Sequence, residues 1–220
     1  MNIEYALIVK TEYHIGTGLE HPGVVDRTLI TRLDGTLVIP AEHFRGLVRD
    51  ACTQILYWKG EAEECCESSL TKAPTSLQRG RVPKTCGLNF RSEAEPCVLC
   101  RLFGTTFIPK RYHFFDATAN QKRKRVSMHN RVDSATGRVP EDAFFSFEVG
   151  TPVTFKGKIE CVQPQDDEIG LLLAGLRLVE RVGARSRRGW GKCRVNITNP
   201  EDVDERLKAY LKIGQEGGEK

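Results

Sequence analysis

The order of strand-like and helix-like hydrophobic patterns limits the fold of this chain more than any other feature. Residues 2–10 alternate between apolar and polar side chains, a period of two that predicts a strand with one buried face. Residues 41–58 and 169–179 instead repeat their apolar side chains every three or four positions, which predicts two amphipathic helices. Further runs of strand-like composition are residues 111–117, 144–150, 153–161 and 192–198.

Along the chain, these patterns give the order β-α-β-β-α-β, which is that of a ferredoxin-like α+β fold and of the RNA-recognition (RRM-type) sheet. The 220 residues suit one domain, residues 1–220, that carries insertions. We expect a cysteine-rich insertion at residues 59–100, a basic excursion at 118–140, and a C-terminal helix with its tail at 200–220. The dipeptide Asp34-Gly35, between two apolar runs, predicts a tight hairpin turn.

Positive charge is concentrated in two windows, although the net charge of the whole chain is only +4. Residues 121–138 contain six basic side chains and one acidic one, and residues 177–194 contain seven and one. The second window also holds three glycines, among them Gly183 and Gly191, where the backbone can approach a ligand closely. Two solvated loops are the simpler explanation, but the glycines and Trp190 favour a surface that binds a polyanion.

The chain has no apolar run of membrane-spanning length, and its first residues, MNIEYALIVKTE, lack the layout of a signal peptide. We therefore expect a cytoplasmic protein without a membrane partner. In a reducing cytoplasm, its eight cysteines are expected to be metal ligands or core residues and not disulfides.

Five of the eight cysteines fall in the polar, proline-containing segment that we expect to be an insertion. Cys97 and Cys100 have the spacing of a metal knuckle, and Cys86 lies upstream of them. With Cys66, or its neighbour Cys65, four thiolates could close a structural Zn²⁺ site and stabilise a segment that has little core. The alternative is that Cys97 and Cys100 pack in the core of a short turn. The remaining cysteines, expected in the core, are Cys52, Cys161 and Cys193.

Four segments together resemble the signatures of the RAMP superfamily, and they occur in the family's order. Residues 14–49 contain an IPxxxxxGxxR-like stretch at the start of the first helix, and residues 100–105, CRLFGT, resemble the family's LFG turn. Residues 129–155 resemble the segment in which a thumb-like hairpin returns to the sheet. Residues 182–192, VGARSRRGWGK, resemble the C-terminal glycine-rich loop. Within the superfamily, the chain most resembles the repeated backbone subunit of type III CRISPR interference complexes.

In that subgroup, subunits stack into a filament along a guide CRISPR RNA and cut complementary target RNA at regular intervals. The resemblance implies these two RNAs, the other subunits of the complex and further copies of the chain as partners. It also implies a thumb-like hairpin around residues 118–140. It places Asp26 where the subgroup has an aspartate needed for cutting. Such a carboxylate can act as a base toward the RNA 2′-hydroxyl, or hold Mg²⁺ or another divalent cation.

The basic windows and the first helix supply the side chains that we expect to contact RNA. Contacts of this kind hold phosphates without reading bases, so binding should be sensitive to salt and nearly independent of sequence. The expected RNA-binding residues are Arg27, His43, Arg45, Arg49, Lys122, Arg123, Lys124, Arg125, Arg131, Arg185, Ser186, Arg187, Arg188 and Trp190.

Two other functions remain open on the sequence alone. The chain could be a guide-RNA scaffold of the same complex in which Asp26 is inert and only bonds its own loop. It could also be a RAMP endoribonuclease that matures the guide, an enzyme that typically uses a histidine-centred, metal-independent site. Few histidines are suitably placed, and the cysteine-rich insertion fits the backbone subunit better.

Overall fold

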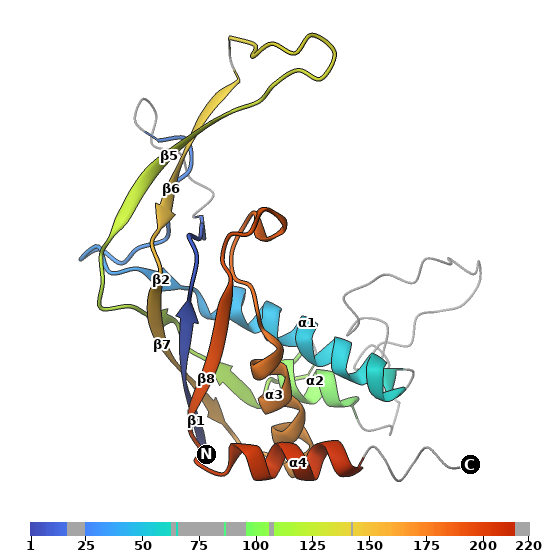
Figure 1. The fold of residues 1–220 in the computed structure, drawn as a ribbon. Helices are drawn as coiled ribbons and strands as arrows, with labels where there is room; N and C mark the ends of the chain where they lie inside the picture. The colour runs from blue at the N-terminus through green and yellow to red at the C-terminus, as the bar shows by residue number, and fades with distance from the viewer. Residues whose placement is uncertain are drawn as a thin grey trace.

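A six-stranded antiparallel sheet forms the centre of the protein (Figure 1). The computed structural model describes residues 1–16, 25–62, 65, 86, 96–105, 108–141 and 143–213. In spatial order, the strands are β2 (Val38–Ile39), β4 (Ala117–Thr118), β7 (Val153–Cys161), β1 (Asn2–Val9) and β8 (Cys193–Asn199), and β3 (Tyr112–Phe114) also pairs with β7.

The pairing of the strands gives the sheet a ferredoxin-like order. Strand β1 lies between β7 and β8 and pairs with both in antiparallel register, for example Leu7 with Phe155 and with Val195. The expected strand at 111–117 is divided into β3 and β4, and both pieces lie on the far side of β7. The resulting spatial order, last strand, first strand, third strand, second strand, agrees with the α+β fold expected from the sequence.

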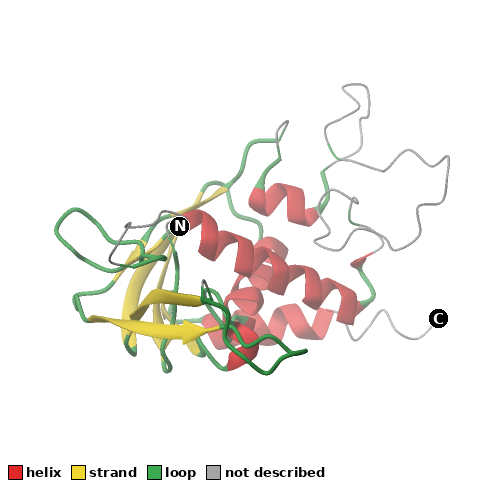
Figure 2. Cartoon of the chain, turned by 90° about the horizontal axis from the view of Figure 1, so that it is seen from above, coloured by secondary structure: helices red, strands yellow, loops and turns green. Residues whose placement is uncertain are grey.

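Alternation along β1 builds the core as predicted, because Ile3, Tyr5, Leu7 and Val9 are all buried. Their side chains pack in one cluster with residues of the helices. The helices form a layer on one side of the sheet, as the view from above shows (Figure 2). The helices of this layer are α1 (Ala41–Lys59), α2 (Val98–Phe103), α3 (Asp166–Leu178) and α4 (Val203–Ile213). None of the helices in the described ranges is long and apolar enough to cross a membrane.

The ends of α1 are set by specific backbone contacts. Pro40 precedes the helix without a capping side chain, and Asp116, at the junction of β3 and β4, accepts a hydrogen bond from the Ala41 N–H at 2.9 Å. Gly60 ends the helix in the left-handed conformation, with φ of 76°. The helix therefore matches the predicted range 41–58 to within one residue, and its buried face includes Phe44 and Val48.

Close packing of α3 against its neighbours depends on two glycines. A Cβ at Gly170 would lie 2.6 Å from the Tyr210 Cβ of α4, and a Cβ at Gly175 would lie 2.4 Å from the Cys52 sulfur of α1. The three helices can approach because these positions carry no side chain. The predicted helix at 169–179 is confirmed, and it begins three residues earlier, at Asp166.

Strands β5 (Lys124–Asn130) and β6 (Phe144–Gly150) form a separate two-stranded sheet that projects beyond the central sheet (Figure 1). The strand predicted at 144–150 is present as β6, and it pairs with the basic excursion, Lys124 opposite Gly150 and Asn130 opposite Phe144. Strand β6 lies outside the central core. One face of the hairpin packs on the loop before β8, and the other face carries exposed residues such as Met128. The predicted turn at Asp34-Gly35 is present, with Gly35 at φ of 81°.

Candidate functional site

A surface pocket lies between the first half of β6 in the β5–β6 hairpin and the loop that precedes β8. Its volume is about 470 Å³. It brings together three chain segments that are far apart in the sequence and that carry an acid, two arginines and three phenylalanines. The lining residues are Asp26, Arg27, Phe144, Phe145, Phe147, Ala184 and Arg185.

Residues 25–27 reach this pocket because they add to the free edge of β6. The Arg27 N–H donates to the Ser146 carbonyl at 3.2 Å, and the Glu148 N–H donates to the Arg27 carbonyl at 2.8 Å. These two bonds place Arg27 opposite Phe147 in a parallel bridge. The side chains of Asp26 and Arg27 are both exposed at this edge.

Asp26 is held by Ser146 through three hydrogen bonds. Its Oδ2 accepts from the Ser146 N–H at 2.6 Å and from the Ser146 hydroxyl at 3.0 Å, and its own N–H donates to the Ser146 Oγ at 3.1 Å. Because the Ser146 backbone and side chain donate to the charged form, the pKa of Asp26 lies below its usual range. The carboxylate is therefore ionised at neutral pH and fixed in direction while it stays exposed.

Arg185 lies over an aromatic cluster on the inner face of the hairpin. Its guanidinium carbon is 4.1 Å from the ring centroid of Phe147, and 5.4 and 5.3 Å from those of Phe145 and Trp190. Arg27 approaches Phe147 as well, at 5.4 Å. The two arginines are thus oriented by stacking, which leaves their N–H groups available to an anion.

The loop that carries Arg185 is shaped by glycines and by His43. A Cβ at Gly191 would lie 1.8 Å from the Val182 carbonyl oxygen, so only glycine fits there. The Gly183 N–H donates to the His43 Nε2 at 3.3 Å, and burial lowers the pKa of His43, which favours the neutral ring that this bond requires. The start of α1 and the basic loop are therefore directly connected.

The structure brings together only part of the predicted RNA-binding set. Asp26, Arg27 and Arg185 line the pocket, and Trp190 contacts the aromatic cluster beside it. The other predicted residues lie on surrounding surfaces. Ser186, Arg187 and Arg188 form a short 3-10 helix on the loop, and Arg45 and Arg49 lie on α1, where Arg45 pairs with Glu42.

The basic residues of the hairpin are exposed, and several of them have partners within the chain. Lys124 pairs with Glu148 at 2.8 Å, and both ends of the Arg125 guanidinium donate to the Glu12 carboxylate at 2.6 and 2.7 Å. Lys122 donates to the Asp34 carbonyl. The Lys124–Glu148 pair lies within the hairpin, whereas the contacts of Arg125 and Lys122 attach it to the rest of the protein. Arg123 and Arg131 are also exposed.

Sequence reasoning missed the residues that form the wall of the pocket. Phe145 and Phe147 were treated only as part of a strand, yet Arg185 lies over both rings, and His129 stacks on Phe145 and meets Phe147 edge-on. Ser146, which holds Asp26, was missed too. The available signal was the FFSF run at 144–147. Its alternate residues Phe145 and Phe147 share one face of the strand, and the run lies close to a basic window.

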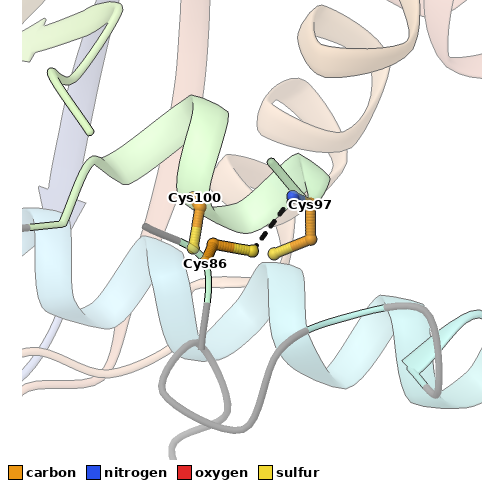
Figure 3. Close-up of side chains that lie close together, drawn as sticks. All are labelled: Cys86, Cys97 and Cys100. Carbon is orange, nitrogen blue, oxygen red and sulfur yellow. Dashed lines mark hydrogen bonds between the residues drawn. The ribbon is translucent and has the colours of Figure 1, made fainter. Parts of the chain in front are cut away.

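Three cysteines come together at the start of α2 (Figure 3). The sulfur atoms of Cys86, Cys97 and Cys100 lie within 4.8 Å of one another, and the Cys97 N–H donates to the Cys86 sulfur at 3.4 Å. Cys66 lies outside the described residues, and Cys65 is buried and lines a cavity of about 380 Å³ together with Cys97.

The three cysteines expected in the core, Cys52, Cys161 and Cys193, are buried, as predicted. Burial raises the pKa of Cys161 to about 11 and that of Cys193 to about 12, so both are thiols at neutral pH.

A family model described as the RAMP superfamily matches residues 6–194. The matched range runs from within β1 to the start of β8 and includes the hairpin, α1, α3 and the glycine-rich loop, and thus every residue of the pocket. No curated protein matched the chain. Since the match covers most of its length, the chain belongs to the RAMP superfamily, whose members act as RNA-binding subunits of CRISPR systems.

Proposed function

We propose that this chain is the repeated guide-RNA-binding backbone subunit of a type III CRISPR interference complex, and that Asp26 cuts the complementary target RNA. The observation that carries the proposal is the pocket between β6 and the loop that precedes β8. There an ionised, exposed and oriented carboxylate lies beside two arginines and three phenylalanines. This combination suits a single-stranded polynucleotide, because phosphates pair with guanidinium groups and bases stack on aromatic rings.

In this proposal, the β5–β6 hairpin is the thumb that separates guide and target. Its exposed outer face includes Met128, Val126 and Phe144, and its basic residues Arg123 and Arg131 are exposed as well. The loop around Arg185 and the first turns of α1 would hold the guide backbone, since His43 connects the two. Repeated copies along the guide would build the filament, with other subunits of the complex at its ends.

Asp26 is better suited to hold and orient a group than to remove a proton by itself. The hydrogen bonds from Ser146 that lower its pKa also weaken it as a base. An exposed carboxylate is an acceptable ligand for Mg²⁺, which commonly binds to one or two carboxylates together with substrate phosphates. When bound, such a cation would polarise the phosphate oxygens. Asp26 would hold it, and Arg27 would stabilise the charge that develops on the reacting phosphate.

The cysteine cluster is proposed to hold a structural Zn²⁺. Sulfur atoms around tetrahedral zinc are about 3.8 Å apart, given the usual Zn–S distance, and the 4.8 Å limit on the three thiols is close to this arrangement. Cys97 and Cys100 are presented by one turn of α2 and Cys86 approaches from the insertion. The fourth ligand would be Cys66 or Cys65.

One observation favours the scaffold function as a second candidate. The Oδ2 atom of Asp26 is already used twice by Ser146, so this side chain also attaches residues 25–27 to β6. A residue with that structural role need not cut RNA. The two candidates are separated by asking whether cutting and binding are lost together.

The test uses the complex assembled with guide RNA and its companion subunits, containing the wild-type chain, Asp26→Asn or Ser146→Ala. End-labelled target RNA is added with Mg²⁺, and both cleavage and target binding are measured. We expect Asp26→Asn to lose at least about 100-fold in cleavage rate while binding stays within a factor of two, a typical range for loss of a catalytic group. Ser146→Ala should keep most of the activity, because the Ser146 N–H still holds the carboxylate.

Cuts that persist at an unchanged rate in Asp26→Asn would show that the chain is a scaffold. Processing of a precursor guide RNA by the isolated chain in the presence of EDTA would instead support the guide-maturing enzyme.

A further inference from the structure

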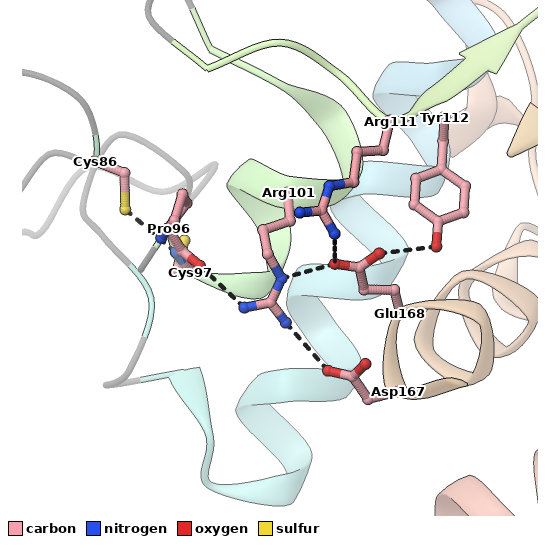
Figure 4. Close-up of polar contacts among 8 residues, drawn as sticks. All are labelled: Cys86, Pro96, Cys97, Arg101, Arg111, Tyr112, Asp167 and Glu168. Atoms are coloured by element: carbon pink, nitrogen blue, oxygen red, sulfur yellow. Dashed lines mark hydrogen bonds and ion pairs between the residues drawn. The ribbon is translucent and has the colours of Figure 1, made fainter. Parts of the chain in front are cut away.

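Helix α2 holds Cys100 and begins directly after Cys97, two of the three clustered cysteines, yet it is only six residues long. A helix of this length has no stability of its own in water, so contacts with its surroundings must hold it in place. Leu99 and Leu102 bury its apolar side in the core. Its polar side is held by one residue, Arg101, whose side chain lies between Pro96 and the first turn of α3 (Figure 4).

The Arg101 guanidinium binds three acceptors from two different elements. Its Nε donates to the Glu168 Oε1 at 2.7 Å and its Nη2 to the Asp167 Oδ2 at 3.1 Å, both in the first turn of α3. Its Nη1 donates to the Pro96 carbonyl at 3.0 Å. One planar group therefore connects the helical layer to the residue immediately before Cys97 (Figure 4).

Glu168 fixes the core end of this connection. Its side chain is fully buried, with 0% exposure, and it also accepts hydrogen bonds from the Tyr112 hydroxyl at 2.9 Å and from Arg111 at 3.5 Å. A buried carboxylate is retained only where donors surround it, so Glu168 and its partners have little freedom to move. Arg101 is consequently held in one orientation by the core.

The other end of the connection controls a single peptide unit. The Pro96 carbonyl and the Cys97 N–H belong to the same planar peptide, in which the two groups point in opposite directions. Arg101 binds the carbonyl, and the Cys86 sulfur accepts from the N–H at 3.4 Å. The Arg101 N–H also donates to the Cys97 carbonyl at 3.0 Å. The buried Glu168 therefore fixes Arg101, and Arg101 fixes the orientation of the Pro96–Cys97 peptide, whose N–H points at the Cys86 sulfur.

We propose that Arg101 is a positioning residue for the metal held by the cysteine cluster, and that it transmits the position of the buried Glu168 to Cys97 and Cys86. The inference rests on the proposed zinc site and goes beyond it, because it assigns to the folded core a part of the metal affinity. An N–H donor to a metal-bound thiolate stabilises its charge, and outer partners of this kind typically change metal affinity 10–100-fold.

The chain offers a matched control for this idea. Arg111 contacts the same Glu168 oxygen as Arg101, at 3.5 Å, but does not share the bond of Arg101 to the Pro96 carbonyl, so Arg111→Gln changes the core end alone. Arg101→Lys keeps a positive charge for Glu168 but cannot bind all three acceptors at once. Arg101→Gln removes the charge as well.

The experiment measures metal binding by the purified full-length chain and these three variants, after removal and readdition of metal. Zinc affinity is obtained by competition with a chelator. Cobalt(II) is added in parallel, and its d–d and thiolate charge-transfer absorption reports the geometry of the site. Thermal unfolding of each metal-free variant is recorded as a control for stability. We expect Arg101→Lys and Arg101→Gln to bind zinc about 10–100-fold more weakly, with altered cobalt spectra, and Arg111→Gln to bind within about threefold of wild type.

Each contrary result has a separate meaning. A wild-type chain that binds neither metal would refute the metal site itself, and the positioning role with it. A wild-type chain that binds zinc, with Arg101 variants of equal affinity and spectrum, would refute the positioning role alone. An equal loss of affinity in Arg111→Gln would do the same, because it would attribute the effect to general stability. If Arg101→Gln does not fold, Arg101→Lys still decides between these outcomes.

Discussion

The two ends of α1 meet two different kinds of polar site. At its start, His43 contacts the loop of the pocket, where Asp26 and Arg27 are exposed and Arg185 is half-buried. At its end, Leu56 and Lys59 line the cavity beside Cys97, where Arg101 pairs with the buried Glu168. For a helix of 19 residues the ends are about 28 Å apart.

The difference between these sites lies in what their charges interact with. The charges of the pocket are oriented by backbone bonds and aromatic rings but still face solvent, so they can bind a ligand at small cost to the fold. Near the cysteines, Arg101 and the buried Glu168 bind each other and are largely excluded from solvent, so they stabilise the structure and are not available to a ligand. Substitutions in the first region should therefore change RNA binding, and substitutions in the second should change stability.

The largest expected effect is that of Glu168→Ala. It leaves Arg101 and the Tyr112 hydroxyl without their buried acceptor, and breaking a buried ion pair typically costs about 3–5 kcal/mol. Urea unfolding should show this loss. Asp167→Ala is the control, because Asp167 binds the same Arg101 from a mostly exposed position and should cost less than about 1 kcal/mol. Equal losses in the two variants would remove the distinction between buried and exposed charges.

A second large effect is expected at Gly191. Alanine there would place its Cβ 1.8 Å from the Val182 carbonyl and would also strain a φ of 68°, so we expect a loss of about 3 kcal/mol. Gly189→Ala is matched in backbone strain, with φ of 87°, but its Cβ would meet open space, and it should cost only about 1 kcal/mol. Similar unfolding curves for the two variants would contradict the close approach in the loop.

Replacement of Arg185 tests the pocket, where the charges face solvent. Arg185→Ala should weaken binding to single-stranded RNA, and the slope of log affinity against log salt concentration should fall by about one. Its free energy of unfolding should change by less than about 1 kcal/mol. Arg177→Ala is the control, since Arg177 pairs with Asp204 and lies outside the pocket. A salt slope that is unchanged in Arg185→Ala would place the RNA elsewhere.

The smallest expected effect concerns acid stability. The pKa of Asp26 is lowered in the folded state, so its ionised form contributes stability above its unfolded pKa of about 4. This contribution is lost as the pH falls through the lower folded-state value. Wild type and Asp26→Asn should therefore differ in unfolding midpoint at neutral pH and converge in strong acid. Parallel curves throughout would contradict the anchoring of Asp26 by Ser146.

Much of the frame of this fold could be predicted from short-range patterns. The spacing of Phe44 and Val48 gave the first helix, the alternation of Ile3 and Tyr5 gave the first strand, and Asp34-Gly35 gave the turn. Such signals are local, because a helix or strand repeats its buried side within a few residues. The basic windows and the spacing of Cys97 and Cys100 could also be recognised, because each involves residues close together in the sequence.

The arrangement of the sites was decided only by tertiary structure. Asp26 and Ser146 are 120 residues apart, and Arg101 and Glu168 are 67 apart, so no periodicity connects them. The run at 144–150 has the composition of a core strand. It lies outside the central sheet, where Phe147 on its inner face packs against Arg185 and Trp190. The sequence alone determined which segments become helices and strands and where positive charge gathers. Packing between distant segments decided which charges face solvent and which are buried, because burial depends on every neighbour at once.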